Sequence, residues 1–181
     1  MKYSLQIMII SGALLGSCSS PSAENNPKVQ LPVADTSSVT TLTSEKNNHM
    51  KGFEINIEKS TQSNTDFRRV LYTAKHLQLV LMSLKPGEEI GAETHADVDQ
   101  FFRFESGSGN CVINGHENKV AAGDVIIVPA GALHNVINTS STKDLKLYTI
   151  YAGPNHKDGV VRATKKEAEE TEEKFDGLTT E

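Results

Sequence analysis

Residues 123–138 have the sequence GDVIIVPAGALHNVIN, in which a short apolar run leads through a turn into a second run. The turn is Pro-Ala-Gly at positions 129–131, and the segments around it predict strands at 124–128 and 133–137. His134 lies near the start of the second strand, directly after the turn. The spacing therefore predicts that the chain changes direction at this turn and that the His134 imidazole projects from the beginning of the next strand.

Residues 87–107 form a second informative stretch, GEEIGAETHADVDQFFRFESG. Side chains two residues apart on a strand point to the same face, so Glu93 and His95 project together. On the following strand, one face carries Gln100, Phe102 and Phe104. If this face is the interior, the amide points inward above two phenylalanine rings, which we expect to line a substrate pocket and restrict water.

Four side chains from these two stretches predict a metal site: Glu93, His95, Gln100 and His134. Two imidazoles and one carboxylate commonly bind first-row divalent metals, and a glutamine adds a neutral oxygen. Mn, Fe, Zn and Ni all suit such a set, so the identity of the ion stays open. A competing interpretation is a hydrogen-bonded polar core that binds no metal.

Short β segments recur along the chain, separated by Gly, Asn, Ser or Pro. The expected strands are residues 53–57, 64–72, 77–84, 100–105, 110–114, 124–128, 133–137 and 145–151. This pattern predicts an all-β fold, either an antiparallel β-barrel or a double-sheet jelly roll. Thr164–Lys174 has a helical composition without a sustained apolar stripe, so we expect a short, loosely docked C-terminal helix.

The composition is that of a globular domain with a mildly acidic charge balance. The 181 residues carry a formal net charge of −5 at pH 7. This argues against nucleic acid as a partner, because that role normally requires a basic patch. The two cysteines are Cys18 and Cys111, and Cys111 lies in a strand pattern where a single cysteine is usually a small buried hydrophobe.

The N-terminal segment has the layout of a secretion signal, because Lys2 precedes a mostly apolar run that ends in LGSC at 15–18. Small residues before a cysteine resemble the lipobox of bacterial lipoproteins, which implies cleavage before Cys18 and lipid attachment there. We therefore expect a protein anchored to a bacterial membrane, facing the periplasm or the cell surface. The expected organisation is a signal segment at 1–17, a flexible tether at 18–48, a β-barrel domain at 49–160 and a polar, partly helical tail at 161–181.

The two informative stretches together resemble the motifs of the cupin superfamily. The second motif is matched at Gly123, Pro129, Gly131, His134 and Asn138. The resemblance covers residues 67–152, and DVDQFFR at 97–103 is similar to small single-domain cupins often likened to the cupin domain of mannose-6-phosphate isomerases. It implies a small β-barrel, the double-stranded β-helix, with one divalent metal ion held inside and frequent assembly as a homodimer.

The first motif departs from the family pattern at two ligand positions. The usual His-x-His is Glu-Thr-His at 93–95, and the usual Glu is Gln100. A second alignment shifts the His-x-His position by two residues and makes Asp97 the carboxylate ligand. We favour Glu93 because it keeps the spacing from Gly87, but both carboxylates stay open at this point.

Three functions fit these observations. The first is a lipid-anchored, metal-binding protein that acts on a small sugar-like or oxygen-rich molecule, as an isomerase or an oxygenase. The second is a non-catalytic module that binds a small ligand at the cell envelope. The third is a structural envelope protein whose barrel is only a stable core. The sequence identifies no general base, so the reaction class stays open.

Other candidate residues carry a weaker signal. We expect the histidines outside the motifs to lie on the surface or in loops: His49, His76, His116 and His156. Arg68 and Arg69 are able to hold an anionic group of a substrate, but adjacent residues on a strand face opposite ways, so only one of them can do so.

Overall fold

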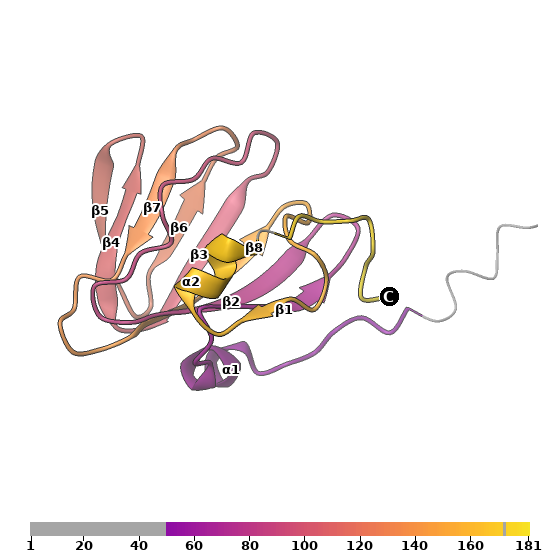
Figure 1. The fold of residues 1–181 in the computed structure, drawn as a ribbon, viewed down its shortest axis with the longest axis horizontal. Helices are drawn as coiled ribbons and strands as arrows, with labels where there is room; N and C mark the ends of the chain where they lie inside the picture. The colour runs from indigo at the N-terminus through magenta and orange to yellow at the C-terminus, as the bar shows by residue number, and fades with distance from the viewer. Residues whose placement is uncertain (1–49, 172) are drawn as a thin grey trace, which may run out of the picture. The chain divides into compact units, whose positions relative to one another are not determined.

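The computed structural model describes residues 50–171 and 173–181 (Figure 1). The predicted signal segment, Cys18, the predicted tether and His49 lie outside the described residues. The helices are α1 (Ile57–Ser63) and α2 (Lys165–Glu170). The strands are β1 (Arg68–Thr73), β2 (Gln78–Leu84), β3 (Gln100–Ser106), β4 (Ser108–Ile113), β5 (His116–Ala121), β6 (Val125–Val128), β7 (His134–Ile137), β8 (Leu145–Tyr151) and β9 (Val161–Arg162).

The strands form two antiparallel sheets. One has the order β6-β3-β8-β2-β1-β9 and the other the order β5-β4-β7. Strands far apart in the sequence are neighbours, as β3 with β8 and β4 with β7, because the chain crosses repeatedly from one sheet to the other. Figure 1 shows β4, β5 and β7 grouped beside the larger sheet. The prediction of an all-β, antiparallel double-sheet fold is confirmed.

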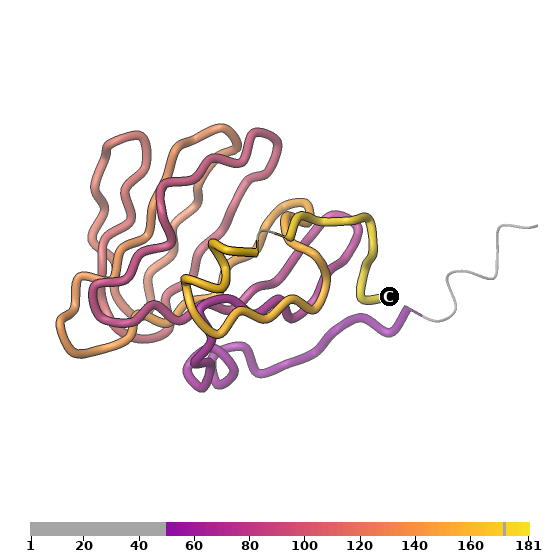
Figure 2. Tube along the Cα trace, viewed as in Figure 1, coloured from indigo at the N-terminus to yellow at the C-terminus, as the bar shows by residue number. Residues whose placement is uncertain are grey.

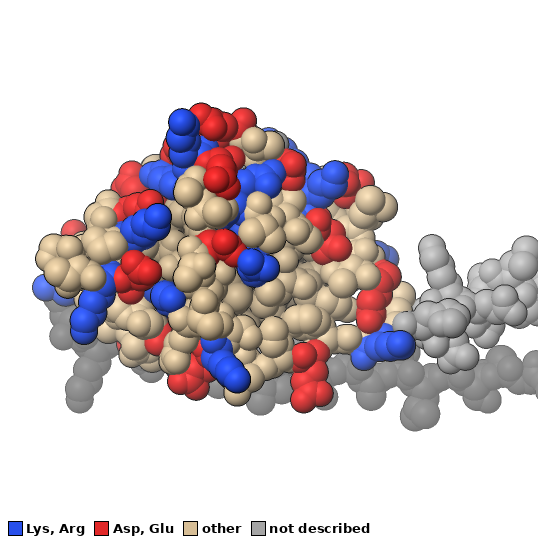
Figure 3. Space-filling model, turned by 60° about the horizontal axis from the view of Figure 1, so that its bottom comes forward, with Lys and Arg blue, Asp and Glu red and all other residues tan. Residues whose placement is uncertain are grey.

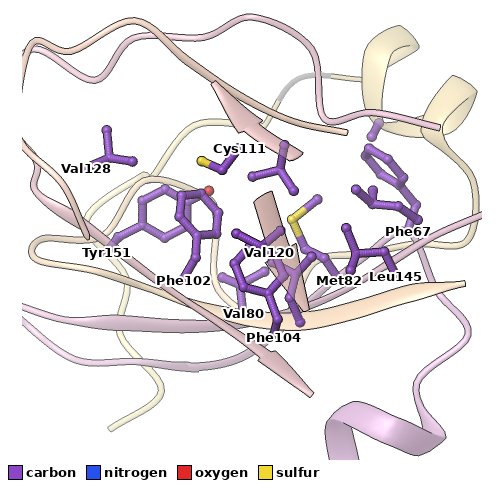
Figure 4. Packing of buried hydrophobic residues seen from close by; sticks show 14 of the residues in the cluster. Phe67, Val80, Met82, Phe102, Phe104, Cys111, Val120, Val128, Leu145 and Tyr151 are labelled. Atoms are coloured by element: carbon purple, nitrogen blue, oxygen red, sulfur yellow. The ribbon is translucent and has the colours of Figure 1, made fainter. Parts of the chain in front are cut away.

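The apolar core lies between the two sheets, as the close-up in Figure 4 shows. Alternate residues of β3 and β8 point inward, so that Phe102, Phe104 and Leu147 are completely buried. The smaller sheet contributes Cys111 and Val136, both 0% exposed, which confirms the buried position expected for the cysteine. Burying one such large apolar side chain stabilises the folded state by about 1.5–3 kcal/mol. The packed interior therefore fixes the strands that carry the site.

The strand predicted at residues 53–57 is wrong, because α1 begins at Ile57. The side-chain oxygen of Asn56 accepts a hydrogen bond from the Lys59 N–H, which is the standard N-cap of a helix. Phe53 stacks on Tyr72 at 5.2 Å between ring centroids and is still 44% exposed. Phe53 therefore covers a residue of β1 without the segment pairing with that strand.

Two strands were not predicted. In β5 the burial pattern leaves only Val120 buried, so an edge strand of mostly polar residues gives no apolar signal. The strand β9 has two residues, paired with Arg68 and Arg69 of β1. Neither element can be recognised from local periodicity, because its pairing partner alone defines it.

The C-terminal segment contains the short helix expected from its composition. The Thr164 hydroxyl accepts a hydrogen bond from the Glu167 N–H and caps α2, and Ala168 is 7% exposed against the core. Farther on, the Thr180 N–H donates to the Thr73 carbonyl at 2.9 Å. The tube in Figure 2 shows this segment turning back beside β1 and β2. The tail is therefore docked along the edge of the larger sheet, and it is less loosely attached than expected.

The exposed surface mixes both signs of charge, and the face in Figure 3 shows acidic and basic side chains interspersed. Across residues 50–171 and 173–181, neither helix is long and apolar enough to cross a membrane.

Candidate metal centre

Two of the predicted ligands are held together by the backbone. Glu93 and His134 form an isolated antiparallel bridge in which each N–H donates to the other's carbonyl at 2.9 Å. The Gly131 N–H donates to the His95 carbonyl at 2.8 Å, and this glycine has φ +79°, a left-handed conformation that favours glycine. The turn before β7 therefore sets the position of both segments.

The three side chains converge on one point. Glu93 Oε1 lies 3.4 Å from His95 Nε2 and 3.4 Å from His134 Nε2. One ligand atom from each residue lies within 4.8 Å of the other two. The side chain of His134 is 1% exposed and that of Glu93 is 29% exposed, so the cluster extends from the interior to an opening.

The hydrogen bond of His134 selects the tautomer that a metal needs. Its Nδ1 lies 3.1 Å from the Ala132 carbonyl oxygen, which can only accept, so Nδ1 carries the proton. The lone pair of Nε2 is then directed at Glu93 and His95. A carbonyl that orients a ligating imidazole through its other nitrogen is a common feature of protein metal sites.

Gln100 lies beside this cluster on the inner face of β3. Its register partner on β8 is Tyr151, whose ring is 5.4 Å from the His95 ring. Its Nε2 donates to the Thr149 hydroxyl at 3.0 Å, which fixes the amide and leaves Oε1 as the free acceptor. Gln100 thus offers a free amide oxygen on the inner face of β3, near Tyr151.

Three buried atoms of the cluster have no hydrogen-bond partner among the described residues: His95 Nε2, His134 Nε2 and Gln100 Oε1. Each buried polar atom left without a partner costs roughly 1–3 kcal/mol, and three at one place are unusual. A hydrogen-bonded core would have supplied donors for them. A divalent cation satisfies two nitrogen lone pairs, an amide oxygen and a carboxylate at once, so these residues fit a metal ion.

The charge of Glu93 is favoured by its surroundings. Burial raises the pKa of this carboxyl, but hydrogen bonding from the imidazoles of His134 and His95, and their charge when Nε2 carries a proton in place of an ion, lower it more strongly, to about 2. The carboxylate is therefore ionised at neutral pH. The structure brings Glu93, and not Asp97, to the two imidazoles, because Asp97 is exposed and lies outside the cluster.

A cavity of about 570 Å³ opens beside the cluster and has the size of a small-molecule site. Its lining residues include Glu93, His95, Asp97, Arg68 and His156. Phe102 and Phe104, predicted to line a substrate pocket, are not among them. Both are completely buried, and the Phe102 ring lies 5.9 Å from that of His134 (Figure 4 labels both phenylalanines). Strand parity placed them on the correct face, but they form the core below the site.

His156, predicted to be a surface or loop residue, is 7% exposed and forms part of the cavity wall. Its Nε2 lies 3.2 Å from the Tyr151 hydroxyl, and its backbone N–H donates to Gln78 Oε1 at 2.9 Å. Burial, and after it the positive charge of Arg68, lowers the pKa of His156 to about 3, while burial raises the pKa of Tyr151. The imidazole is therefore neutral and accepts a hydrogen bond from the phenol.

The sequence offers no signal for this wall, because Gln78 and His156 are far apart in the chain and only the folded tail brings them together. The other outlying histidines behave as expected, since His76 and His116 are exposed. Of the two adjacent arginines, Arg68 lines the cavity and Arg69 is exposed, in agreement with the alternation of a strand.

Comparison with known proteins gives a consistent result. The family profile described as Cupin domain matches residues 80–151. The uncharacterized protein YrkC of Bacillus subtilis (strain 168) is 48% identical over 124 residues, which cover 65% of this chain and 66% of YrkC. The uncharacterized protein L612 of Acanthamoeba polyphaga mimivirus is 40% identical over 117 residues, or 63% of this chain and 73% of L612.

Among solved structures, BH2720 from Bacillus halodurans is 42% identical, with a TM-score of 0.65. The alignment covers 68% of this chain and 98% of BH2720. The matched part of the chain spans just under two thirds of YrkC, at 66%, so these likenesses concern the β domain and do not transfer an activity.

Proposed function

Because this chain belongs to the cupin family, we propose that it binds one divalent metal ion through Glu93, His95 and His134, with Gln100 as a fourth ligand. The observation that carries the proposal is the set of buried, unpartnered atoms His95 Nε2, His134 Nε2 and Gln100 Oε1 around one ionised carboxylate. A carboxylate, an amide oxygen and two imidazoles suit Mn, Fe, Zn or Ni.

The cavity beside this cluster supports a function on a small, oxygen-rich molecule, as a metal-dependent isomerase or oxygenase. A bound divalent ion supplies a Lewis acid that polarises a substrate oxygen, or a redox centre if it is iron or manganese. The residues around the ion set its charge and its surroundings. Glu93 contributes one negative charge, so the loaded site remains cationic and attracts oxygen donors, while the buried Phe102 ring closes the floor behind His134.

A second candidate is a small-ligand-binding module without catalysis. It is favoured by one contact: the Nε2 atom of the cavity-lining His156 lies 3.2 Å from the Tyr151 hydroxyl and is already engaged, and burial lowers the pKa of this imidazole to about 3, so it is a weak base at neutral pH. Binding requires no proton acceptor, and the same metal and cavity serve it. Conversion of a bound ligand to a product would show that the protein is an enzyme and not a binding module.

The export signal, the lipid at Cys18, the cell-envelope location and the homodimer stay predictions. They are compatible with both candidates, since a tether would hold either an enzyme or a receptor at a membrane surface. Mass spectrometry of the purified chain tests the lipid directly, because Cys18→Ser should remove the acyl mass.

Metal stoichiometry tests the proposed function. We expect elemental analysis of the purified chain to give about one divalent ion per molecule, and Glu93→Ala and His134→Ala each to lower this markedly while the fold is retained. The matched control is Asp97→Asn, which changes a carboxylate that lines the same cavity but lies outside the cluster. Unchanged stoichiometry in the two ligand variants, or an equal loss in the control, would refute the ligand assignment.

A further inference from the structure

We propose that the cavity accepts a small carboxylic acid whose carboxylate is bound by the guanidinium group of Arg68, while oxygen atoms elsewhere in the same molecule reach the metal site. This inference rests on the proposed metal function and specifies its substrate class. It narrows the small sugar-like or oxygen-rich molecule expected from the sequence to an acidic one.

The two adjacent arginines of β1 provide the first argument, because only one of them has its charge matched. Arg69 is exposed and pairs with Asp66, with Nε donating to Oδ2 at 2.8 Å. Arg68 lines the cavity, and its buried Nε has no hydrogen-bond partner among the described residues. Within residues 50–171 and 173–181, no carboxylate is paired with Arg68.

The surroundings of Arg68 give the second argument. Its guanidinium carbon lies 6.0 Å from the centroid of the Phe67 ring, which orients the planar group against an apolar neighbour. An arginine stays charged at all physiological pH values, and a partly buried charge without a counter-ion is unfavourable. An anion that enters the cavity removes this penalty and accepts hydrogen bonds from the guanidinium.

The position of Arg68 relative to the cluster gives the third argument. One cavity is lined by Arg68 together with Glu93 and His95, so a single small molecule can contact both the guanidinium and the ligands. Its volume of about 570 Å³ accommodates such a molecule. The site therefore has two points of attachment, a cationic fork and a metal position, and this arrangement matches an acid that carries further oxygen atoms.

The rim of the cavity favours a carboxylate over a phosphate. Asp97, Glu169 and Glu173 line the cavity as well, together with Lys174. The three acidic groups outnumber this one ammonium group, so the rim repels a dianionic phosphate more strongly than a monoanionic carboxylate. A carboxylate also matches the two parallel N–H donors of an arginine.

Calorimetric binding to the purified full chain, loaded with Mn²⁺ and free of metal, tests the inference with matched probes. The acids are gluconate and lactate, the neutral analogues are sorbitol and propane-1,2-diol, and the phosphate is sorbitol 6-phosphate. We expect one of the acids to bind the loaded chain at least about tenfold more tightly than its neutral analogue, and gluconate to bind more tightly than the phosphate.

Variants assign the preference to one residue. We expect Arg68→Gln to weaken binding of the preferred acid by about tenfold or more and Arg68→Lys to weaken it less, because lysine keeps the charge but loses the planar fork. The matched control Arg69→Gln, one residue away on the opposite face, should bind the acid as the unchanged chain does. Circular dichroism and metal content of each variant are measured in the same samples.

The inference would be overturned if the acids bind no more tightly than their neutral analogues, or if neither binds. Tighter binding of sorbitol 6-phosphate than of gluconate would also overturn it. So would equal affinities of the Arg68→Gln and Arg69→Gln chains for the acid. Each of these is recognisable in protein that carries its metal. Absence of metal from the unchanged chain instead refutes the proposed function, and in that case acid binding by the metal-free protein that depends on Arg68 still supports the anion site.

Discussion

The two walls of the cavity are built in different ways. On one wall, Glu93 and His95 line the cavity, and a backbone bridge holds Glu93 in register with the buried His134 of a second stretch. On the other wall, Arg68 comes from β1, which lies between β2 and β9, and His156 comes from a segment that follows the last long strand. The first wall is defined by residue spacing and the second by tertiary packing. Damage to one wall should therefore leave the other largely intact.

The largest expected effect is on the second wall. Gln78 accepts hydrogen bonds from the Asn155 and His156 N–H groups and donates to the His156 carbonyl at 2.7 Å. Gln78→Leu leaves several buried polar groups without partners, each costing about 1–3 kcal/mol, so we expect unfolding free energy to fall by about 3–5 kcal/mol. Urea unfolding measures this loss, and metal stoichiometry measured alongside should stay near that of the unchanged chain. A parallel loss of metal would show that the walls are not independent.

The next effect is on the first wall and comes from the ion itself. A ligand that binds only the folded state stabilises it by about 2.7 kcal/mol when its free concentration is a hundredfold above Kd. We expect thermal unfolding of the unchanged chain to shift upward with added metal and to return after chelation. His134→Ala should abolish this shift, while Arg68→Gln should keep it. An equal shift in the His134→Ala protein would place the ion elsewhere.

Near neutral pH the smallest expected effect is the pH dependence contributed by His156, which grows only as the solution is acidified. Its pKa is lowered in the folded state to about 3, below the ordinary value of 6.5, so above 6.5 neither state binds the proton. Below 6.5 the unfolded chain binds a proton that the folded chain excludes. Stability is therefore lost as the pH falls from about 6.5 towards 3, with a slope of at most about 1.4 kcal/mol per pH unit.

Substitution of this histidine tests the assignment. His156→Gln removes the titrating group, so the unfolding free energy of the variant should depend less on pH between 6.5 and 4 than that of the unchanged chain. Identical slopes in the two proteins would mean that another group causes the acid sensitivity.

The first wall was predictable because its information is local. The spacing around the turn at 129–131 and the two-residue interval between Glu93 and His95 predicted that a carboxylate and both imidazoles converge, and the structure brings them together, although it has only an isolated bridge at Glu93 where a strand was assumed. The choice between Glu93 and Asp97 required coordinates, since either spacing suits a strand. The all-β fold was predictable for the same reason, because seven of the expected segments contain or overlap observed strands.

The second wall was not predictable, because its contacts join segments with no local pattern. His156 has no motif around it, and its burial depends on Gln78, more than seventy residues earlier. The strand predicted at 53–57 was wrong for a related reason. Its alternation of apolar and polar residues matches a strand, but Asn56 caps a helix there. Edge strands such as β5 carry too few apolar residues to be recognised.

The central claim is that the unpartnered atoms of the first wall bind an ion, and anomalous X-ray diffraction from a crystal of the metal-loaded protein tests it most directly. We expect one strong anomalous peak within about 2.0–2.3 Å of His95 Nε2, His134 Nε2 and a Glu93 carboxylate oxygen, the distance range of first-row metals in proteins. No peak at this position, or a water molecule hydrogen-bonded to both imidazoles in its place, would contradict the account.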